Sequence, residues 1–558
     1  MSEFCYSNWV DEVKQKIKDA HFKGDIDDSD QTRDVYSHDA SLFELRPELI
    51  VFPKDADDVK ILVDVVDSLK HQNHKLSLTA RSAGTDMSGG AINESIIVDF
   101  SKYFKKIELI TQHVGHAQPG VFYRDFEVET FKHHALMPSY PASRDLATIG
   151  GMVANNSGGE KSLEYGKTEN FVTKLKVVLA DGNEYDIEPL NHVQLTQKIA
   201  KHDFEASVYE KTLKLINDHY DKINAAKPKV TKNSTGYNLW DVYDKQKGIF
   251  DLTKLFVGSQ GTLGLVTDIN FKLVPTRPYS GLLVCFLKNI DPLGDIINTV
   301  MAHKPATFES FDDHTLYLSI KFFPSFHKML GTSQFIKLMI SLIPDGFMLL
   351  RGIPKLILMI EFNGQTQEEV DLKIDNMRND LARFKMAMER DETAAKSKKF
   401  WIMRRQSFNL LRNKVKDKHT APFIDDLVVS PPYLVEFLPK LRKIIKKYDL
   451  LATIAGHMGD GNFHIIPLMK LEEKSERNKL LPAMKEVNEL VLSYHGSLSG
   501  EHNDGLIRGP WLEEMYGKEV LGIFKEVKKI FDPKDIFNPH KKADASWDYS
   551  FSHIRDEF

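Results

Sequence analysis

Two histidines flank a short polar turn in the stretch AGHMGDGNFH. The dipeptide Asp460-Gly461 predicts a two-residue hairpin turn, because both central positions of such a turn need positive φ. That turn pairs His457 with His464, and directly opposed residues have Cβ atoms about 5 Å apart. Alternation along the strands puts Asn462 on the same face as both histidines. Two imidazoles at that separation suit a borderline divalent metal such as Zn²⁺ or Mn²⁺.

A hairpin of this kind needs a strand on each side, and the flanks LATIAG and FHIIPL both have strand character. In the predicted register Met458 and Phe463 face the opposite side, towards a core. The alternative interpretation is a polar hairpin that carries two surface histidines. In either case the hairpin lies in the half of the chain after about residue 280, where strands and amphipathic helices alternate.

The bulk composition limits the class of protein. A chain of 558 residues is too long for one core, so two or three domains are expected. The net charge of −5 excludes the basic footprint of a nucleic-acid-binding protein. Two cysteines, Cys5 and Cys285, suffice neither for a disulfide framework nor for an iron–sulfur cluster. The charged start and the lack of an apolar run of about 18 residues predict a cytoplasmic protein without a spanning helix.

Three glycine-rich loops in the first half are each attached to strands: RSAGTDMSGG, ATIGGMVANNSGG and VGSQGTLGLVT. Glycine lets backbone N–H groups approach an anion closely. The first loop is not a G-x-G-x-x-G fingerprint and a strand follows it, which argues against a Rossmann site, and it lacks the Gly-Lys-Ser/Thr of a P-loop. Three such loops together indicate one long phosphate-bearing ligand.

The three loops precede AGHMGDGNFH, SGEHNDG and FDPKDIFNPHK, and this ordered set resembles the FAD-dependent 2-hydroxyacid dehydrogenases of the vanillyl-alcohol oxidase superfamily, whose members oxidise D-lactate, D-2-hydroxyglutarate or glycolate. The resemblance covers residues from about 36 to 543. It implies an α+β fold, with a two-subdomain FAD-binding domain of the PCMH type over 36–277 and an α+β FAD-linked oxidase C-terminal cap domain over 278–545. Residues 1–35 are then an N-terminal helical extension and residues 546–558 a tail.

The resemblance implies non-covalent FAD, because family members with a histidine-linked flavin carry His where Thr85 stands. The residues implied to embrace the FAD pyrophosphate are Arg81, Ser82, Ala83, Gly84, Thr85 and Asp86. The residues implied to line the ribityl chain and the isoalloxazine are Pro141, Ala142, Ser143, Thr148, Gly151, Asn155, Ser157 and Gly158. The residues implied to close on the flavin are Gly261, Thr262 and Val266, through backbone contacts, and Asn538 at the flavin edge.

Three side chains depart from the family pattern. Asp86 stands where Ser is common, and a carboxylate beside phosphates is unfavourable unless it points away. Gln260 replaces a usual Glu, and Asn503 replaces a usual Gly, which changes the local backbone freedom.

The resemblance also gives the hairpin a partner, because it implies that Glu501 joins His457 and His464 as the ligands of a divalent metal with open coordination positions. A 2-hydroxy acid chelates such a metal through its carboxylate and hydroxyl, and the metal lowers the hydroxyl pKa. His502 would remove the hydroxyl proton while the α-hydrogen leaves as hydride to flavin N5. Asn462 would hydrogen-bond the substrate oxygen. The alternative for His502 is a capping or core histidine.

An anionic substrate needs a cation, and the family's substrate arginine follows a tryptophan by three positions, which selects Arg404. The alternative is a solvated basic helix face. The stretch APFIDDLVV lacks the lysine found in 2-hydroxyglutarate dehydrogenases. This difference favours a small monocarboxylate, with D-lactate as the expected substrate.

Reduced flavin must hand its electrons on, so the expected acceptor is a quinone, a cytochrome or an electron-transfer flavoprotein. The apolar stretch 315–360 has a basic excess and predicts either a peripheral contact with the inner face of a membrane or a buried helical pair. Two other functions remain open. One is a flavin-dependent transferase of the alkylglycerone phosphate synthase type, which has a run of histidines where this chain has GEHNDG. The other is a partner-dependent flavin subunit of an oxidase complex.

Overall fold

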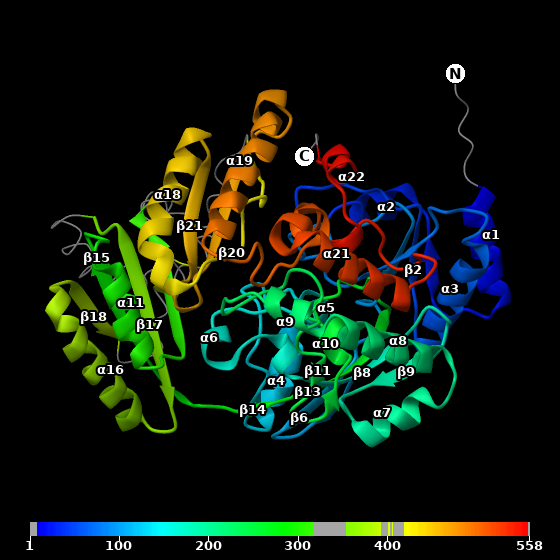
Figure 1. Cartoon of the computed structure of the whole chain (residues 1–558), viewed down its shortest axis with the longest axis horizontal. Coiled ribbons are helices and arrows are strands. Elements are labelled where there is room, and N and C mark those ends of the chain that lie inside the picture. Colours follow the sequence, from blue (N-terminus) through cyan, green and yellow to red (C-terminus); the bar gives the residue numbers. More distant parts are fainter. Residues whose placement is uncertain are drawn as a thin grey trace.

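The computed structural model describes residues 8–313, 315–316, 353–391, 400–401, 404 and 418–555. These residues form two α+β halves, which confirms the expected fold class, and Figure 1 shows them side by side. The chain passes from the first half to the second between β14 (Val274–Pro275) and β15 (Tyr279–Leu287).

The first half begins with a four-stranded sheet. Its strands, in spatial order, are β1 (Asp25–Asp27), β2 (Leu49–Phe52), β4 (Ile96–Asp99) and β3 (Leu78–Arg81). Strands β2, β4 and β3 are parallel, and β1 is antiparallel to β2. The helices of this part are α1 (Asn8–Asp19), α2 (Asp30–Tyr36) and α3 (Ala56–Leu69). The residues expected as an N-terminal extension therefore contribute α1 and the edge strand β1, and Val13 of α1 packs into the core beneath the sheet.

The second part of this half is a five-stranded antiparallel sheet. Its strands, in spatial order, are β5 (Ile107–Ile110), β6 (Val114–Ala117), β13 (Leu265–Lys272), β8 (Val172–Val178) and β9 (Glu184–Ile187). The helices around it are α4 (Tyr123–Lys132), α5 (Ile149–Asn155), α6 (Ser162–Tyr165), α7 (His192–Ile199), α8 (Phe204–Asp218), α9 (Tyr220–Ala226) and α10 (Thr253–Phe256). Two-residue strands complete it: β7 (Ala135–Leu136), which pairs with β14, and β10 (Leu190–Asn191), β11 (Tyr243–Asp244) and β12 (Ile249–Phe250).

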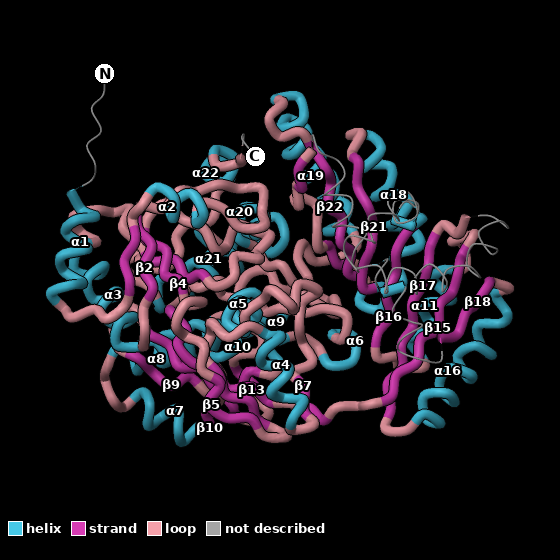
Figure 2. Tube along the Cα trace, turned by 180° about the vertical axis from the view of Figure 1, so that it is seen from behind, coloured by secondary structure: helices cyan, strands magenta, loops and turns pink. Residues whose placement is uncertain are grey.

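The second half is built on an eight-stranded antiparallel sheet, which Figure 2 shows from behind. Its main path is β18 (Ala387–Asp391), β15, β17 (Leu356–Gly364), β16 (Thr307–Asp312), β21 (Leu451–His457), β22 (Asn462–Met469) and β19 (His419–Thr420), and β20 (Leu427–Val428) also pairs with β22. One face shares a single apolar core with the helices α11 (Leu293–Ala302), α16 (Gln367–Leu381), α18 (Leu434–Lys447) and α19 (Lys474–Ser493). Side chains alternate between the two faces of the sheet along β15. Leu283 and Cys285 enter that core, whereas Leu282 and Val284 face the other side, where Trp401 packs.

The C-terminal segment returns to the first half, although it was expected to belong to the cap up to residue 545. After the short α20 (Gly505–Arg508), α21 (Leu512–Phe531), which kinks at Gly517, packs Phe524 and Val527 into the core of the five-stranded sheet. In Figure 1 this red segment, with α22 (Trp547–Ser552), lies against the first half. The backbone N–H of Asn538 then donates to the carbonyl of Leu78, beside β3.

The stretch expected as an apolar, basic insertion over 315–360 falls mostly on residues 317–352, which lie outside the described residues. Its last residues belong to β17, in the interior of the cap sheet, so an insertion would end before Leu356. Among the helices in the described ranges, none is long and apolar enough to cross a membrane.

Candidate active site

A cavity of about 920 Å³ is lined by residues of both halves. From the first half it receives the three glycine-rich loops, and from the second half it receives residues of the cap sheet and of the segment that carries Glu501. The residues implied for FAD that line it are Arg81, Ser82, Ala83, Gly84, Thr85, Asp86, Pro141, Ala142, Ser143, Thr148, Gly151, Asn155, Ser157, Gly261 and Val266. A cavity of this size, walled by glycine-rich backbone, fits a dinucleotide such as FAD.

Three residues expected at the flavin are not among the residues that line the cavity. Asn538 is fully buried, and its amide donates to the carbonyls of Gly90 and Gln260 at 2.8 and 2.7 Å. The hydroxyl of Thr262 donates to the carbonyl of Ser259. Gly158 leaves room for the side chain of Glu501, because a Cβ there would lie 3.3 Å from Glu501 Cγ.

The hydroxyl of Thr262 and the amide of Asn538 already pair with protein groups. The backbone contact expected for Thr262, and the places beside the flavin expected for Gly158 and Asn538, stay predictions.

The departures Asp86 and Gln260 have a structural explanation. Oδ2 of Asp86 accepts hydrogen bonds from the backbone N–H of Ser88 and of Gly90 at 2.9 and 2.7 Å, and Oδ1 accepts from the Asn155 amide at 2.8 Å. The carboxylate thus turns back into its own loop. Gln260 donates to the Ser88 hydroxyl at 2.8 Å and accepts from the backbone N–H of Gly505 at 2.8 Å, which ties two loops together.

The hairpin itself has a different register from the predicted one. His457 pairs with Asn462 and Ala455 pairs with His464, so the connection is the four-residue turn 458–461. The prediction of a two-residue turn at Asp460-Gly461 was wrong, because such a turn needs positive φ at both positions and only Gly461 has it. The change amounts to two residues in the pairing, so the two histidines and Asn462 remain on one face.

The histidines and Glu501 do converge. Ligand atoms of His457, His464 and Glu501 all lie within 4.8 Å of one another, and Nε2 of His457 lies 3.2 Å from Oε1 of Glu501. Two ligands about 2.0–2.1 Å from a shared tetrahedral Zn²⁺ are separated by about 3.3 Å. Two imidazole nitrogens and one carboxylate oxygen are donors that Zn²⁺ or Mn²⁺ accepts, so the residues fit the expected metal.

Buried carboxylates lie behind all three imidazoles of the site. Nδ1 of His457 donates to Oε1 of Glu309 at 2.6 Å. Nδ1 of His464 and of His502 lie 3.3 and 2.8 Å from the two oxygens of Asp425. An ionised carboxylate only accepts, so each Nδ1 carries a hydrogen, and Nε2 has a free lone pair whenever the ring is neutral.

The pKa values follow from these pairs. Burial lowers the pKa of His502, but Asp426 and Asp425 outweigh it and raise that pKa to about 9. Burial lowers the pKa of His457, but the Glu309 carboxylate outweighs burial, so the pKa lies above its usual value. A cation held by His457, His464 and Glu501 would oppose the shift of His502, because like charges disfavour an imidazolium.

Asn462 takes a structural position. It is fully buried, does not line the cavity, and donates to Oδ1 of Asp426 at 3.0 Å. The other oxygen of Asp426 accepts from the backbone N–H groups of Glu501 and His502 at 2.9 and 2.7 Å. Asp426 accepts from this amide and fixes the turn that presents Glu501 and His502. The amide oxygen of Asn462 has no hydrogen-bond partner among the described residues, and its bond to the substrate stays a prediction.

Arg404 lines the cavity, as expected, but it already has an anionic partner. Its guanidinium pairs with Oε2 of Glu309, whose other oxygen bonds His457. Burial raises the pKa of Glu309, but Arg404 and His457 outweigh burial, so the pKa lies below its usual value. The expected substrate arginine and an expected metal ligand are thus joined by one ionised carboxylate.

A buried lysine that sequence reasoning missed joins the two sides of the site. Nζ of Lys232 lies 2.6 Å from Oε1 of Glu501 and 3.0 Å from Oδ2 of Asp460 in the hairpin turn, and only 1% of its side chain is exposed. Burial raises the pKa of Glu501, but Lys232 and His457 lower it well below its usual value. Lys232 therefore keeps Glu501 ionised.

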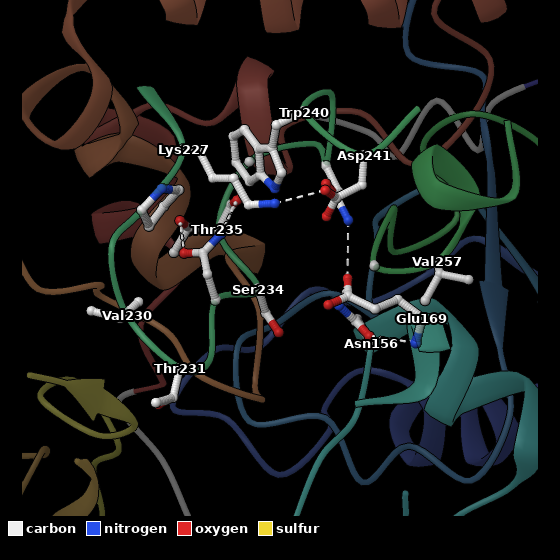
Figure 3. A pocket seen from close by; sticks show the side chains of 15 residues that line it. Asn156, Glu169, Lys227, Val230, Thr231, Ser234, Thr235, Trp240, Asp241 and Val257 are labelled. Carbon is white, nitrogen blue, oxygen red and sulfur yellow. Dashed lines mark hydrogen bonds and ion pairs between the residues drawn. The ribbon is translucent and has the colours of Figure 1, made fainter. Parts of the chain in front are cut away.

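The segment that carries Lys232 also lines a second, smaller cavity of about 170 Å³, shown in Figure 3. Its polar groups are paired among themselves: Lys227 with Asp241 at 2.7 Å, and Glu169 with Asn156 at 2.7 Å. The Asn238 amide also donates to Glu169 at 3.1 Å, so Glu169 links this segment to Asn156 at the end of α5.

Two family models match the chain in this order. Residues 47–188 match the FAD binding domain, and residues 277–542 match the C-terminal domain of FAD linked oxidases. The chain therefore belongs to the FAD-linked oxidases, with a PCMH-type FAD-binding domain followed by the C-terminal oxidase domain. The domain match supports FAD as the cofactor.

Curated relatives cover almost the whole chain at low identity. D-2-hydroxyglutarate dehydrogenase of Pseudomonas putida is 28% identical over 95% of this chain, and the match spans 51%, about half, of that protein. Glycolate oxidase subunit GlcD of Bacillus subtilis is 27% identical over 95% of this chain and 96% of its own. D-lactate dehydrogenase of Archaeoglobus fulgidus is 24% identical over 96% of this chain and 99% of its own.

Solved structures share the fold. Alkyldihydroxyacetonephosphate synthase matches with a TM-score of 0.65 and 15% identity, over 95% of this chain and 85% of the other. p-Cresol methylhydroxylase matches with a TM-score of 0.67 and 15% identity, over 97% of this chain and 98% of the other. At these identities the likeness describes the architecture alone.

Proposed function

We propose that this protein oxidises a small D-2-hydroxy acid, with D-lactate as the expected substrate, to the 2-oxo acid with FAD as the first electron acceptor. The observation that carries the proposal is the convergence of His457, His464 and Glu501 beside His502, at a cavity whose other walls are the glycine-rich loops of an FAD-binding domain.

The bound groups supply chemistry that the side chains lack. Non-covalent FAD supplies the acceptor for the hydride that leaves the α-carbon. A divalent metal, Zn²⁺ or Mn²⁺, supplies a Lewis acid that lowers the pKa of the substrate hydroxyl.

The chain's own residues orient the acid and move its proton. Nε2 of His502 takes the hydroxyl proton, because its Nδ1 faces Asp425. Arg404 attracts the substrate carboxylate at the cavity wall, and its pairing with Glu309 holds the guanidinium in place. Trp401 and Ile466 supply apolar surface to the same cavity and reduce its access to water.

The lining residues support a small, uncharged substrate side chain. Besides Arg404 and His464, the described lining near the cap sheet consists of the uncharged residues Trp401, Thr420, Thr453, Ala455 and Ile466. The three described arginines of the lining already have partners, and these are backbone carbonyls for Arg81, Glu127 for Arg144 and Glu309 for Arg404. A second substrate carboxylate would therefore compete with existing pairs.

D-2-hydroxyglutarate is the competing acid, because several relatives carry it in their names. A partner-dependent flavin subunit is the second candidate, since one relative of nearly equal length is named a subunit. We also propose that the reduced flavin passes its electrons to a quinone, a cytochrome or an electron-transfer flavoprotein. A further part of the proposal is a membrane contact through residues 315–360, which co-sedimentation with anionic vesicles would test.

Rapid mixing of the FAD-loaded protein with D-lactate, without oxygen, separates the roles of the two polar residues. We expect His502→Ala to keep the flavin but slow its reduction at least about a hundredfold. We expect Arg404→Lys to raise the half-saturating substrate concentration about tenfold, because lysine lacks the bidentate fork. Reduction of His502→Ala within a few-fold of the parent rate would refute the assignment of the base.

A further inference from the structure

We propose that Asp425 is a positioning residue that orients two imidazoles at once, the metal ligand His464 and the base His502. The inference deepens the proposed function and rests on it, since it concerns how the chain holds those two rings. The sequence marks Asp425 only as one of two aspartates before a short strand.

The geometry joins one carboxylate to two rings. Oδ2 of Asp425 lies 2.8 Å from Nδ1 of His502, and Oδ1 lies 3.3 Å from Nδ1 of His464. The two rings are stacked, with centroids 5.1 Å apart and planes 28° apart, so a single carboxylate reaches both. Oδ2 of Asp425 and Nδ1 of His502 make no hydrogen bond of ordinary geometry among the described residues, so their contact is an ion pair of the two buried groups.

The carboxylate is itself fixed. Asp425 is fully buried, its Oδ1 accepts from the backbone N–H of Ile465 at 3.1 Å, and its carbonyl accepts from Arg508 at 2.9 Å. The bond to Ile465 anchors the carboxylate to β22 directly beside His464. An aspartate that accepts from a backbone N–H and faces two imidazoles is ionised at neutral pH, and an ionised carboxylate only accepts.

The chemical consequence is one tautomer for both rings. Because an ionised carboxylate accepts only, Nδ1 carries hydrogen in each ring and Nε2 keeps its lone pair. In His464 that lone pair serves a cation, and in His502 it serves the substrate proton. Loss of Asp425 would therefore damage metal binding and proton transfer together.

A direct metal-ligand role for Asp425 is the competing interpretation, because Asp425, His464 and His502 also bring ligand atoms within 4.8 Å. The 2.8 Å contact argues against it, since two ligands on one tetrahedral Zn²⁺ stand about 3.3 Å apart.

The test measures Zn²⁺ affinity of the FAD-loaded full chain, by competition with a zinc-binding dye. We expect Asp425→Asn to lower the affinity about 10- to 100-fold, both in the parent and in a His502→Ala background. We expect His502→Ala alone to leave the affinity within about threefold, because His502 is not a ligand. Asp425→Ser repeats the test with a shorter, uncharged side chain.

A matched control separates this role from the general cost of losing a buried aspartate. Asp58 is also fully buried, and it accepts from the backbone N–H groups of Lys23 and Lys54, far from the site in the chain. Asp58→Asn should lower the melting temperature without changing Zn²⁺ affinity or the rate of flavin reduction.

Each result decides between the interpretations. Unchanged Zn²⁺ affinity in Asp425→Asn overturns the proposal. An equal loss in His502→Ala overturns it as well, since both residues would then be ligands. Unchanged affinity in His457→Ala and Glu501→Gln would refute the proposed metal site itself, which distinguishes that failure from a failure of Asp425 alone.

Discussion

Oε1 of Glu309 accepts a hydrogen bond from Nδ1 of His457 at 2.6 Å, and the other oxygen of the same carboxylate pairs with Arg404. The strand register makes this contact, because Ser310 of β16 pairs with Gly456 of β21 and so brings Glu309 beside His457. One buried carboxylate thus fixes the tautomer of a candidate metal ligand and the place of a candidate substrate cation.

Glu309→Gln should therefore weaken the metal site. The glutamine keeps the shape of the side chain but loses the charge that holds the hydrogen on Nδ1 of His457, so we expect Zn²⁺ affinity to fall about tenfold or more. The measurement is dye competition on the FAD-loaded protein. Glu205→Gln, which changes a buried glutamate paired with Lys198, is the control and should leave the affinity unchanged. Equal affinities for Glu309→Gln and the parent would contradict the role of this carboxylate.

Gly461→Ala should strongly destabilise the hairpin that carries both histidines. Gly461 has φ +66°, and a Cβ there would lie 1.8 Å from the carbonyl oxygen of Val429, so the backbone must move. We expect a loss of more than about 2 kcal/mol, measured by thermal unfolding. Gly248→Ala is the control, because Gly248 has φ +65° but open space around it, and strain alone should cost about 1 kcal/mol. Similar losses in both variants would show that the clash is relieved.

Asp86→Ala should weaken FAD binding. The carboxylate holds the backbone N–H groups of Ser88 and Gly90, in the loop after β3, and the amide of Asn155, at the end of α5. Gly90 and Asn155 line the cavity. We expect the dissociation constant for FAD to rise about tenfold or more, because hydrogen bonds to a charged acceptor contribute about 1.5–3 kcal/mol each. Rebinding of FAD to the deflavinated protein, followed by flavin fluorescence, measures it. An unchanged constant would mean that the loop keeps its form without Asp86.

The stability of the protein should depend on pH through Asp39 at the cavity wall. Burial and the nearby Asp86 carboxylate raise the pKa of Asp39 to about 7. Between pH about 4 and 7 the folded chain binds more protons than the unfolded chain, so the free energy of unfolding falls as the pH rises. Asp39→Asn removes this dependence on pH. We expect the free energy of unfolding of the variant to rise by about 1–3 kcal/mol relative to the parent between pH 5 and 8. Parallel melting profiles for both proteins would contradict the shifted pKa.

Local patterns in the sequence predicted the class of the fold and which residues share the candidate site. The glycine-rich loops, the hairpin and the stretch that carries Glu501 are each recognisable within a dozen residues. The predicted hairpin register was wrong by two residues, yet the shared face survived because side chains alternate with a period of two. A shift of one residue would have turned His457 away from His464.

The carboxylates behind the imidazoles could not be predicted in this way. Glu309 contacts a histidine 148 positions later in the chain, and Lys232 contacts a glutamate 269 positions later. These pairs depend on strand order and on the packing of the two halves, which no local pattern encodes. The protein contacts of Asn462 and Asn538 could not be predicted for the same reason, since only the fold reveals which groups accept from their amides.

The most direct measurement is a titration of the yellow protein with D-lactate, L-lactate, D-2-hydroxyglutarate and glycolate in the absence of oxygen, with flavin absorbance followed before and after treatment with EDTA. We expect D-lactate to bleach the flavin, EDTA to abolish the bleaching, and Zn²⁺ or Mn²⁺ to restore it, because His457, His464 and Glu501 would then hold the metal that activates the acid. Bleaching that EDTA leaves unchanged, or no bleaching by any of the four acids, would contradict a metal-assisted 2-hydroxyacid dehydrogenase.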